Sequence, residues 1–313
     1  MNEKGKFPDP HWLLNDAEDK KMEFVVVIVS GCLHEDDIQF IQHQLSKSDI
    51  SANSVSVLSN NKAVEITISV STHKAWDLFR NIILINSESG LDVAVIPSSI
   101  RKKKLLVCDM DSTIVQTETL DDIALRTGIG EQISRITFRA MQGELDYRQS
   151  LDERVSLLAG LPEDVFIEVA ETIRFNAGAE KLLHLTKEHG IRTVLVSGGF
   201  EPIVKKVARK LGFDRYVCNR AEVTESQLTG KLLEPIVDGT TKLNVLLEEC
   251  KRLSIDPVES CCIGDGANDI PMLLAAGLGI GYRGKPVVRT SIPYQINSTG
   301  LESVLSMMGI SYH

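Results

Sequence analysis

Two acidic residues, separated by a single residue, follow a short apolar stretch in the first half of the chain. Asp109 and Asp111 come directly after residues 105–108, whose composition predicts a buried strand. Because alternate residues of an extended segment point the same way, both carboxylates leave the strand end on one side. Carboxylates held this close oppose each other's ionisation unless a cation lies between them. The pair indicates a metal-assisted nucleophile site, although an isolated pair of this kind is more often explained by a helix cap.

A second acidic turn follows another short apolar stretch, residues 260–263. Gly264 and Gly266 allow a tight turn, while Asp265 and Asp269 supply carboxylate oxygens. Mg²⁺ prefers such hard ligands and completes its octahedron with water and substrate phosphate oxygens. A helix cap with surface acids is the simpler interpretation, but it leaves the gathering of glycines and acids in one turn unexplained. We therefore expect a magnesium site here.

Anion-binding groups lie between these two acidic stretches. Ser197, Gly198 and Gly199 stand between a predicted strand and a predicted helix, where backbone amides attract phosphate. Lys242 begins another helical pattern. Taken alone, the Ser-Gly-Gly triplet is typical of a plain turn and the lysine of a solvated side chain. Together with the acids they supply what phosphoryl transfer requires, namely a cation site, phosphate donors and a free aspartate.

The elements around these residues predict an α/β fold with a Rossmann-like parallel sheet and helices on both faces. The expected strands are residues 105–108, 193–196, 260–263 and 278–281, and the expected helices are residues 179–188, 202–211, 242–252 and 268–276. Residues 217–233 predict a small hairpin with Thr229 and Gly230 at its turn. In open parallel sheets, reactive groups gather beyond the carboxyl ends of the strands. The acids and the anion-binding groups are therefore expected in one crevice.

Two further parts of the chain carry different patterns. Residues 23–98 predict the order β-α-β-β-α-β of an α+β ferredoxin-like domain, with an alternating apolar strand at residues 64–70. Residues 117–174 are helical in pattern and are expected to form an inserted cap, which leaves 104–116 and 175–313 as the core. Residues 1–22 are expected to be a polar leader, and the basic run at 101–104 a solvated linker.

Composition excludes several classes of protein. The chain of 313 residues has 34 basic and 43 acidic residues, a net charge of −9, which argues against a nucleic-acid-binding surface. Its longest apolar run, residues 24–29, is far shorter than a membrane span, and the first residues lack the pattern of a signal peptide. Six scattered cysteines without a CxxC pair fit a reducing compartment. We expect a cytoplasmic protein that binds neither membrane nor nucleic acid.

The order of these motifs resembles that of the haloacid dehalogenase-like phosphatases. The stretches are DMDST from Asp109, SGG from Ser197, Lys242 itself, and GDGAND from Gly264. Longer stretches, DMDSTIVQTE at 109–118, GELDYRQSLDERVSLL at 143–158 and VSGGF at 196–200, are similar to bacterial phosphoserine phosphatases. The resemblance covers residues 104–310 or so. It implies Mg²⁺-dependent hydrolysis of O-phospho-L-serine, the last step of serine biosynthesis.

The same resemblance implies roles for the acids. Asp109 would be the nucleophile that takes the phosphoryl group as an aspartyl-phosphate, and Asp111 the acid and base of the two half-reactions. Mg²⁺ would be held by the carboxylates of Asp109 and Asp265 and by the backbone carbonyl of Asp111, with Asp269 in support. The phosphate ligands would be Ser197, the amide of Gly198 or Gly199, and Lys242, with Asn268 ordering the acidic turn.

Residues of the cap would select the substrate. Glu118 matches the family's ligand for the substrate ammonium and Arg154 its ligand for the carboxylate, so a zwitterion meets one fixed charge of each sign. Without the surrounding motif, Arg154 would be interpreted as a surface partner of a neighbouring acid such as Asp152. Met141 and Tyr147 stand where the family has apolar cap residues, but a phenylalanine is expected at position 147, and the hydroxyl needs a partner. The cap is expected to open and close.

Alternatives stay open at this point. A phosphatase for another small phosphate, or a phosphotransferase to an amino-acid acceptor, would share the core motifs. A response-regulator receiver would share the clustered aspartates, but it has no use for Asp111 or the helical insertion, and a non-catalytic amino-acid sensor would lack a motif acid. Residues 23–98 resemble ACT-like modules in element order only. Gly31 would then lie in a turn that contacts an amino-acid effector, although an ordinary turn glycine is the simpler interpretation. Homodimer formation or packing explains this domain at least as well.

Overall fold

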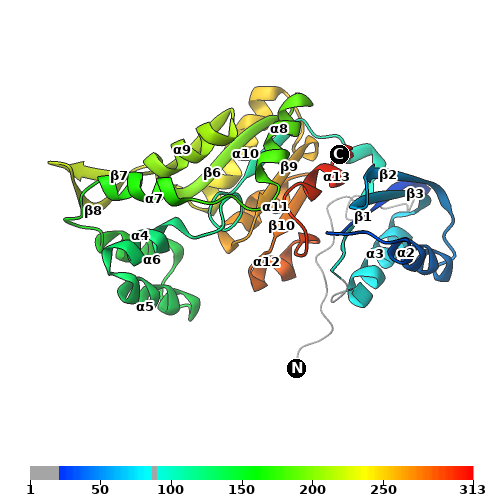
Figure 1. The fold of residues 1–313 in the computed structure, drawn as a ribbon, viewed down its shortest axis with the longest axis horizontal. Coiled ribbons are helices and arrows are strands. Elements are labelled where there is room, and N and C mark those ends of the chain that lie inside the picture. Colours follow the sequence, from blue (N-terminus) through cyan, green and yellow to red (C-terminus); the bar gives the residue numbers. More distant parts are fainter. Residues whose placement is uncertain (1–20, 87–89, 313) are drawn as a thin grey trace.

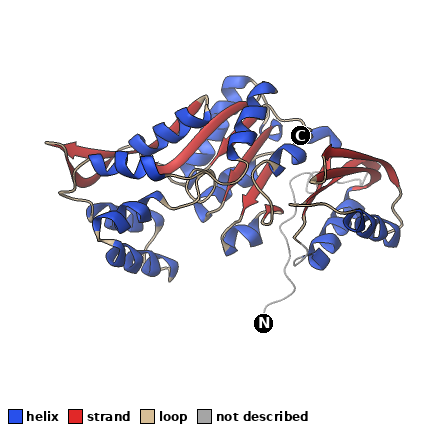
Figure 2. Ribbon diagram, viewed as in Figure 1, coloured by secondary structure: helices blue, strands red, loops and turns tan. Residues whose placement is uncertain are grey.

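The computed structural model describes residues 21–86 and 90–312, and two sheets organise them (Figure 1). Figure 2 shows the larger sheet with helices around it and the smaller sheet beside it. The predicted leader lies outside the described residues, apart from Lys21 and Met22, which begin the first strand. Within the described ranges no helix is long and apolar enough to cross a membrane.

The N-terminal sheet has four antiparallel strands in the order β2-β3-β1-β4. Its unit consists of β1 (Lys21–Val29), α2 (Glu35–Lys47), β2 (Ala52–Ser59), β3 (Ala63–Ser71), α3 (Thr72–Asn86) and β4 (Asp92–Pro97). In β3 the apolar Ile66 and Ile68 are buried, whereas Glu65 and Thr67, each of which precedes one of them, are partly exposed, which is the predicted alternation. The predicted β-α-β-β-α-β order is confirmed, and it gives a ferredoxin-like arrangement.

The second sheet has seven strands in the order β11-β10-β9-β5-β6-β7-β8, and every neighbouring pair except β7 and β8 is parallel. The strands are β5 (Leu105–Cys108), β6 (Arg192–Phe200), β7 (Arg215–Thr224), β8 (Gln227–Leu233), β9 (Ser260–Gly264), β10 (Leu278–Tyr282) and β11 (Tyr294–Ile296). The helices around them are α8 (Ala179–Glu188), α9 (Glu201–Leu211), α10 (Gly239–Leu253), α11 (Ile270–Ala275), α12 (Pro286–Ser291) and α13 (Ser303–Met307).

Helices cover both faces of this sheet, as predicted. Alternate residues of the central strand β5 enter different apolar cores: Leu106 and Cys108 belong to one, and Leu105 and Val107 to the other. The first core also holds side chains of α8 and α9, and the second holds side chains of α10 and α11. The α/β prediction with a parallel sheet between two helical layers is therefore confirmed.

Four helices stand between β5 and α8 in the chain. They are α4 (Thr119–Thr127), α5 (Gly130–Met141), α6 (Tyr147–Ser156) and α7 (Asp164–Thr172). Figure 1 shows α4, α5 and α6 as a group beside the hairpin of β7 and β8. α7 lies against the core instead, where Phe166 stacks on Phe200 at the end of β6 with 4.6 Å between the ring centroids. The helical pattern predicted for this insertion is confirmed.

The hairpin differs from the prediction at its turn. The residues between β7 and β8 are Glu225 and Ser226, both with positive φ (51° and 59°). Thr229 and Gly230 lie within β8 instead. A Cβ atom at Gly230 would lie 3.0 Å from the backbone oxygen of Ser156 in α6. The predicted turn is wrong because this glycine serves a close approach between strand and helix.

Two side chains of the basic run at 101–104 are buried, whereas Lys102 and Lys104 are exposed, as predicted. Arg101 is buried and donates to Glu65 Oε2 (2.5 Å) and to the carbonyl oxygen of Ser306 (2.6 Å). Lys103 is buried as well and donates to the carbonyl oxygen of Val258 (2.7 Å). Because Glu65 belongs to β3 and Ser306 to α13, Arg101 ties the N-terminal sheet to the core. The expectation of a solvated linker is wrong for these two side chains.

The short C-terminal elements join the two sheets. β11, α12 and α13 have no counterpart among the predicted elements, since each is too short to show a periodic pattern. Tyr294 of β11 donates through its hydroxyl to the carbonyl oxygen of Val95 in β4 (3.0 Å). Asp92, at the start of β4, accepts hydrogen bonds from the backbone N–H groups of Asn297 and Thr299 (both 2.9 Å). The edge of the smaller sheet is thereby fixed to the core.

Candidate active site

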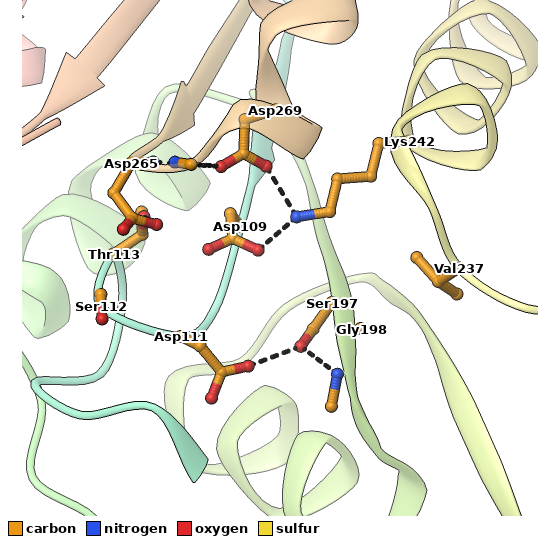
Figure 3. Close-up of polar contacts among 12 residues, drawn as sticks. Asp109, Asp111, Ser112, Thr113, Ser197, Gly198, Val237, Lys242, Asp265 and Asp269 are labelled. Atoms are coloured by element: carbon orange, nitrogen blue, oxygen red, sulfur yellow. Dashed lines mark hydrogen bonds and ion pairs between the residues drawn. The ribbon is translucent and has the colours of Figure 1, made fainter. Parts of the chain in front are cut away.

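A pocket of about 290 Å³ opens at the carboxyl ends of β5, β6 and β9. Its lining includes Asp109, Asp111, Glu118, Thr119, Tyr147, Leu151, Arg154, Gly198, Gly199, Asp265, Asn268 and Lys285. Three further residues lie behind the lining, within hydrogen-bond distance of its acids: Ser197, Lys242 and Asp269 (Figure 3). The structure thus brings the three predicted polar clusters to one place, where parallel strands end.

Three buried carboxylates form the floor of the site. Asp109, Asp265 and Asp269 each offer one oxygen, and these atoms lie within 4.8 Å of one another. Lys242 donates through Nζ to Asp109 Oδ1 and, at 2.6 Å, to Asp269 Oδ1 (Figure 3). Its side chain is 0% exposed. α10, which carries Lys242, begins at Gly239, so the lysine lies in the first helical turn rather than at the predicted start.

The backbone of the turn after β9 holds Asp269 in place. Asp269 Oδ2 accepts hydrogen bonds from the N–H groups of Asp265 (3.1 Å) and Gly266 (2.9 Å). A Cβ atom at Gly264 would lie 2.4 Å from Asp269 Cγ, so glycine is required for the carboxylate to fit. The helix predicted for residues 268–276 begins later, at Ile270, because a short 3₁₀ turn precedes it.

Burial changes the proton affinities of these groups. It raises the pKa of Asp109 well above its usual range, a shift that Lys242 opposes and Asp269 reinforces. Burial also raises the pKa of Asp265 to about 6. For Lys242, burial on its own would lower the pKa, but the charges of Asp109 and Asp269 outweigh it and the pKa is raised. The lysine therefore stays charged between its two acids.

The floor fits a divalent cation. The three carboxylates contact the buried ammonium group of Lys242 and that of Lys285, which Asp265 shares with Glu118. Two ammonium groups thus face four carboxylates, which leaves two negative charges without a balancing cation when all are ionised. The donors are hard oxygens next to a pocket, the set that Mg²⁺ prefers because it keeps places for water and phosphate oxygens. Asp109, Asp265 and Asp269 are the carboxylates that such an ion would bind.

Asp111 is held in the pocket wall by two hydrogen bonds. Its Oδ2 accepts from the Ser197 hydroxyl (3.0 Å), and its Oδ1 accepts from the backbone N–H of Thr119 (2.8 Å). The Ser197 oxygen in turn accepts from the N–H of Gly199 (2.8 Å). β6 extends through this stretch, so these residues end the strand instead of following it as predicted. Burial raises the pKa of Asp111 to about 6.

Oppositely charged side chains face the pocket near the cap. Glu118 Oε1 accepts hydrogen bonds from the Ser112 hydroxyl (3.1 Å) and from Lys285 Nζ (2.9 Å). Although burial alone would raise it, the charge of Lys285 holds the pKa of Glu118 below its usual range. Arg154 lines the pocket from α6 and donates through Nε to the carbonyl oxygen of Ser150 (3.1 Å).

The acids next to Arg154 in sequence are bound by other arginines. Arg148 donates to Asp152 Oδ2 (2.8 Å), and Arg139 pairs with Glu153 Oε2 (2.6 Å). The interpretation of Arg154 as a surface partner of these neighbours therefore does not describe the arrangement found. Its place in the pocket lining leaves it available to an anionic ligand.

The remaining predicted residues lie around the same pocket or outside the described part. Tyr147 donates through its hydroxyl to the carbonyl oxygen of Val237 (3.1 Å), which is the partner that this departure from phenylalanine requires. Asn268 lines the pocket. Met141 ends α5, and its side chain lies outside the described part of the structure. Sequence reasoning missed Lys285, since a lone lysine in a loop after β10 gives no signal of its own.

Known proteins share this part of the chain. The family model described as haloacid dehalogenase-like hydrolase matches residues 106–274. A phosphoserine phosphatase of Streptococcus thermophilus is 41% identical over 206 residues, which are 66% of this chain and 96% of that relative. The residues that the family model matches include the acids, the Ser-Gly-Gly triplet and Lys242.

Two solved structures that are similar to this chain also belong to phosphoserine phosphatases or probable ones. The phospho-aspartyl intermediate analogue of a phosphoserine phosphatase has a TM-score of 0.62 at 37% identity, and the match covers 66% of this chain and 98% of that one. The unliganded probable phosphoserine phosphatase of Vibrio cholerae has a TM-score of 0.73 at 28% identity, with 92% of this chain and 86% of that one covered. The chain therefore belongs to the haloacid dehalogenase-like hydrolase family and, within it, to the phosphoserine phosphatases.

Proposed function

We propose that this chain hydrolyses O-phospho-L-serine to L-serine and inorganic phosphate through an aspartyl-phosphate intermediate, as the last step of serine biosynthesis. The observation that carries the proposal is a single pocket with acids and phosphate donors at its floor and two opposite charges, Glu118 and Arg154, near the cap. A phosphorylated amino acid needs one partner for each of its three charged groups. The names of the relatives, and a substrate-bound phosphoserine phosphatase among the similar structures, support the same substrate.

In the first half-reaction we assign Asp109 as the nucleophile. One of its carboxylate oxygens forms a bond to phosphorus while the bond between phosphorus and the serine oxygen breaks. Lys242 orients the Asp109 carboxylate through a hydrogen bond, and its charge favours the ionised form against the effect of burial. The departing serine oxygen takes a proton from Asp111, whose pKa of about 6 suits a group that gives and regains a proton near neutral pH.

In the second half-reaction Asp111 acts as the base. It takes a proton from a water molecule, whose oxygen attacks the phosphorus of the intermediate, so that phosphate leaves and the Asp109 carboxylate is restored. The hydrogen bonds from Ser197 and Thr119 hold the same carboxyl group in place for both transfers. This second acid supports hydrolysis over a receiver-like role, in which the phosphoryl group would be retained.

The carboxylates of Asp109, Asp265 and Asp269 and the backbone carbonyl of Asp111 are the groups that we assign to Mg²⁺. When bound, this ion neutralises phosphoryl oxygens that would otherwise repel the attacking carboxylate. The groups assigned to phosphate are the Ser197 hydroxyl, the amide of Gly198 or Gly199, and Lys242, with Asn268 steadying the acidic turn.

The cap residues are assigned to the amino-acid part of the substrate. Glu118 would bind the ammonium group, and Arg154 would bind the carboxylate in the two-pronged geometry that a guanidinium allows. Tyr147 and Met141 would cover the substrate from the cap. Opening and closing of this cap would admit substrate and then exclude bulk water during phosphorylation. Hydrogen exchange at the cap amides that is unaffected by ligand would contradict this movement.

Two roles of the N-terminal sheet remain proposals. A pocket of about 200 Å³ between Gly31, Lys62, Arg283 and Glu302 supports an amino-acid effector, because it offers both signs of charge. The outermost strand β2 exposes Val57, at 61%, which supports a homodimer formed through this edge. Calorimetry with L-serine tests the first role, and light scattering of wild type against Val57→Lys tests the second. Absence of heat, or an unchanged mass, would remove the corresponding role.

We also propose a cytoplasmic location. All six cysteines lie within the described residues, and all six are free thiols. Free thiols persist in a reducing compartment and are oxidised in most extracellular ones. Fractionation of the source cells would test this placement.

A panel of phosphate monoesters, assayed for phosphate release with Mg²⁺ and with EDTA, tests the proposed reaction. We expect the highest kcat/KM for phosphoserine and no turnover with the chelator. Glu118→Gln should lower kcat/KM for phosphoserine but spare phosphoglycolate, which has no amine, whereas Arg154→Met should impair both. Equal kcat/KM values for phosphoserine and phosphoglycolate would overturn the substrate, and a stable phosphoprotein without phosphate release would favour the receiver.

A further inference from the structure

Lys285 places an ammonium group at the carboxylate where the substrate ammonium is proposed to bind. Its Nζ lies 2.9 Å from Glu118 Oε1 and 3.1 Å from Asp265 Oδ2, and the residue lines the same pocket as Arg154. Its side chain is 54% exposed, whereas that of Lys242 is 0% exposed. The Lys285 ammonium can therefore move into solvent when it leaves Glu118. Lys285 is thus a counter-ion of Glu118 that another cation can replace.

The backbone of Lys285 is fixed while its side chain reaches across the pocket. Its N–H donates to the carbonyl oxygen of Asp265 (2.8 Å), and its own carbonyl oxygen accepts from the N–H of Val288 (2.8 Å) in α12. Glu118, at the other end of the contact, immediately precedes α4 of the cap. The side chain thus connects the core with the cap entrance, and rotation about its own bonds is sufficient to release it.

We propose that Lys285 is a specificity-determining residue: it pairs with Glu118 in the free protein, is displaced by the amine of an amine-bearing phosphate ester, and stays when the ligand has no amine. The inference rests on the proposed function, since it takes Glu118 as the ammonium ligand. Two ammonium groups on one carboxylate repel each other, so an incoming amine weakens the contact of Lys285. A ligand without an amine leaves that contact intact.

Removal of the Lys285 charge therefore has opposite consequences for the two kinds of ligand. An amine-bearing ligand no longer has to displace Lys285 from Glu118, so it binds more tightly. A ligand that has only anionic groups loses a nearby cation and gains nothing in return. The ratio of the dissociation constants of an amine-bearing ligand and a ligand without an amine should therefore change when Lys285 is replaced. That change measures how strongly Lys285 and the ligand amine compete for Glu118.

The experiment measures the binding of two phosphonates that the enzyme cannot hydrolyse, L-2-amino-4-phosphonobutanoate and 4-phosphonobutanoate, by calorimetry with Mg²⁺ present. They differ only in the amine. For Lys285→Met we expect the amino ligand to bind about two- to fivefold more tightly, the scale of a partly exposed ion pair, and the other ligand to bind no more tightly than to wild type. Lys285→Gln repeats the measurement if the first variant melts at a lower temperature.

Two controls isolate the contact with Glu118. Arg283 lies in the same loop as Lys285, but it lines the pocket of about 200 Å³ near the N-terminal sheet. Arg283→Met should therefore change the dissociation constants of both ligands by the same factor. In a Glu118→Gln background, Lys285→Met should no longer change the ratio. A ratio that is unchanged in Lys285→Met, or a change that persists without Glu118, would overturn the inference. If wild type fails to bind the amino ligand at all, the proposed substrate fails instead.

Discussion

Asp111→Asn separates the proton transfers that we assign to Asp111 from its structural contacts. The amide oxygen can still accept the hydrogen bond from the N–H of Thr119, which lies 2.8 Å from Asp111 Oδ1. The amide nitrogen would face the Ser197 hydroxyl, 3.0 Å from Oδ2, and can donate to it. The fold is therefore expected to stay the same, while the proton that the carboxyl group gives and takes is lost.

The size of the effect depends on the leaving group. General acid–base catalysis contributes about 10²- to 10⁴-fold, so kcat/KM for phosphoserine, which releases a strongly basic alkoxide, should fall by about that factor. The phenolate released from p-nitrophenyl phosphate is stable near neutral pH and needs no proton. Its kcat/KM reports the phosphorylation step, and we expect it to fall by less than about tenfold. Hydrolysis of the aspartyl-phosphate lacks its base with either substrate.

Stopped-flow release of nitrophenolate measures both effects. Wild type should release it steadily, whereas Asp111→Asn should give a stoichiometric burst and then a slow phase, because the intermediate accumulates. Asp109→Asn is the matched control: the same change of group, two residues away, should give neither burst nor turnover. An equal fall in kcat/KM for both substrates, without a burst, would refute the assignment of Asp111 as acid and base.

Three further predictions concern packing and charge. Gly264→Ala places a methyl carbon 2.4 Å from Asp269 Cγ, so the free energy of unfolding should fall by about 1–3 kcal/mol; an unchanged urea midpoint would contradict this. Burial lowers the pKa of Lys103 from 10.5 to about 8, so the folded protein holds this proton less tightly than the unfolded chain does. The stability of wild type relative to Lys103→Met should therefore rise from pH 8 to pH 10.5, and a flat difference would exclude burial as the cause. Arg101→Met leaves Glu65 without its partner, and denaturant unfolding should show a loss of about 3–5 kcal/mol; a loss below about 1 kcal/mol would mean that solvent screens the pair.

The acids of the site could be predicted because their positions depend on strand ends. Asp109 follows β5 and Asp265 follows β9, and these two strands are parallel neighbours in the sheet. Both acids therefore leave the same edge, and an apolar stretch followed by an acid is visible in the sequence without any knowledge of the rest of the fold. The alternation of Ile66 and Ile68 with polar residues identified β3 in the same way, from a period of two.

Residues whose surroundings come from distant parts of the chain could not be predicted. Gly230 looked like a turn residue because the sequence does not show its close approach to Ser156, which lies in α6 and is distant in sequence. Arg101 looked solvated because its partners Glu65 and Ser306 come from β3 and α13. Lys285 gave no signal, since only the fold brings its loop beside Glu118. Sequence patterns describe residues within one helix or strand, whereas each of these contacts joins two segments that are distant in the chain.

Lys242 and Lys285 suit different tasks because their surroundings differ. Lys242 is fully buried between Asp109 and Asp269, and loss of its charge would leave two buried carboxylates without this cation, so it has to stay in place through the cycle. Lys285 is 54% exposed and Glu118 42% exposed, and a pair of this kind breaks at small cost. A site that keeps Asp109 and Asp269 paired but admits a new ammonium group in each turnover needs one lysine of each kind. Phosphoryl transfer should therefore depend on Lys242, and the choice between ligands on Lys285.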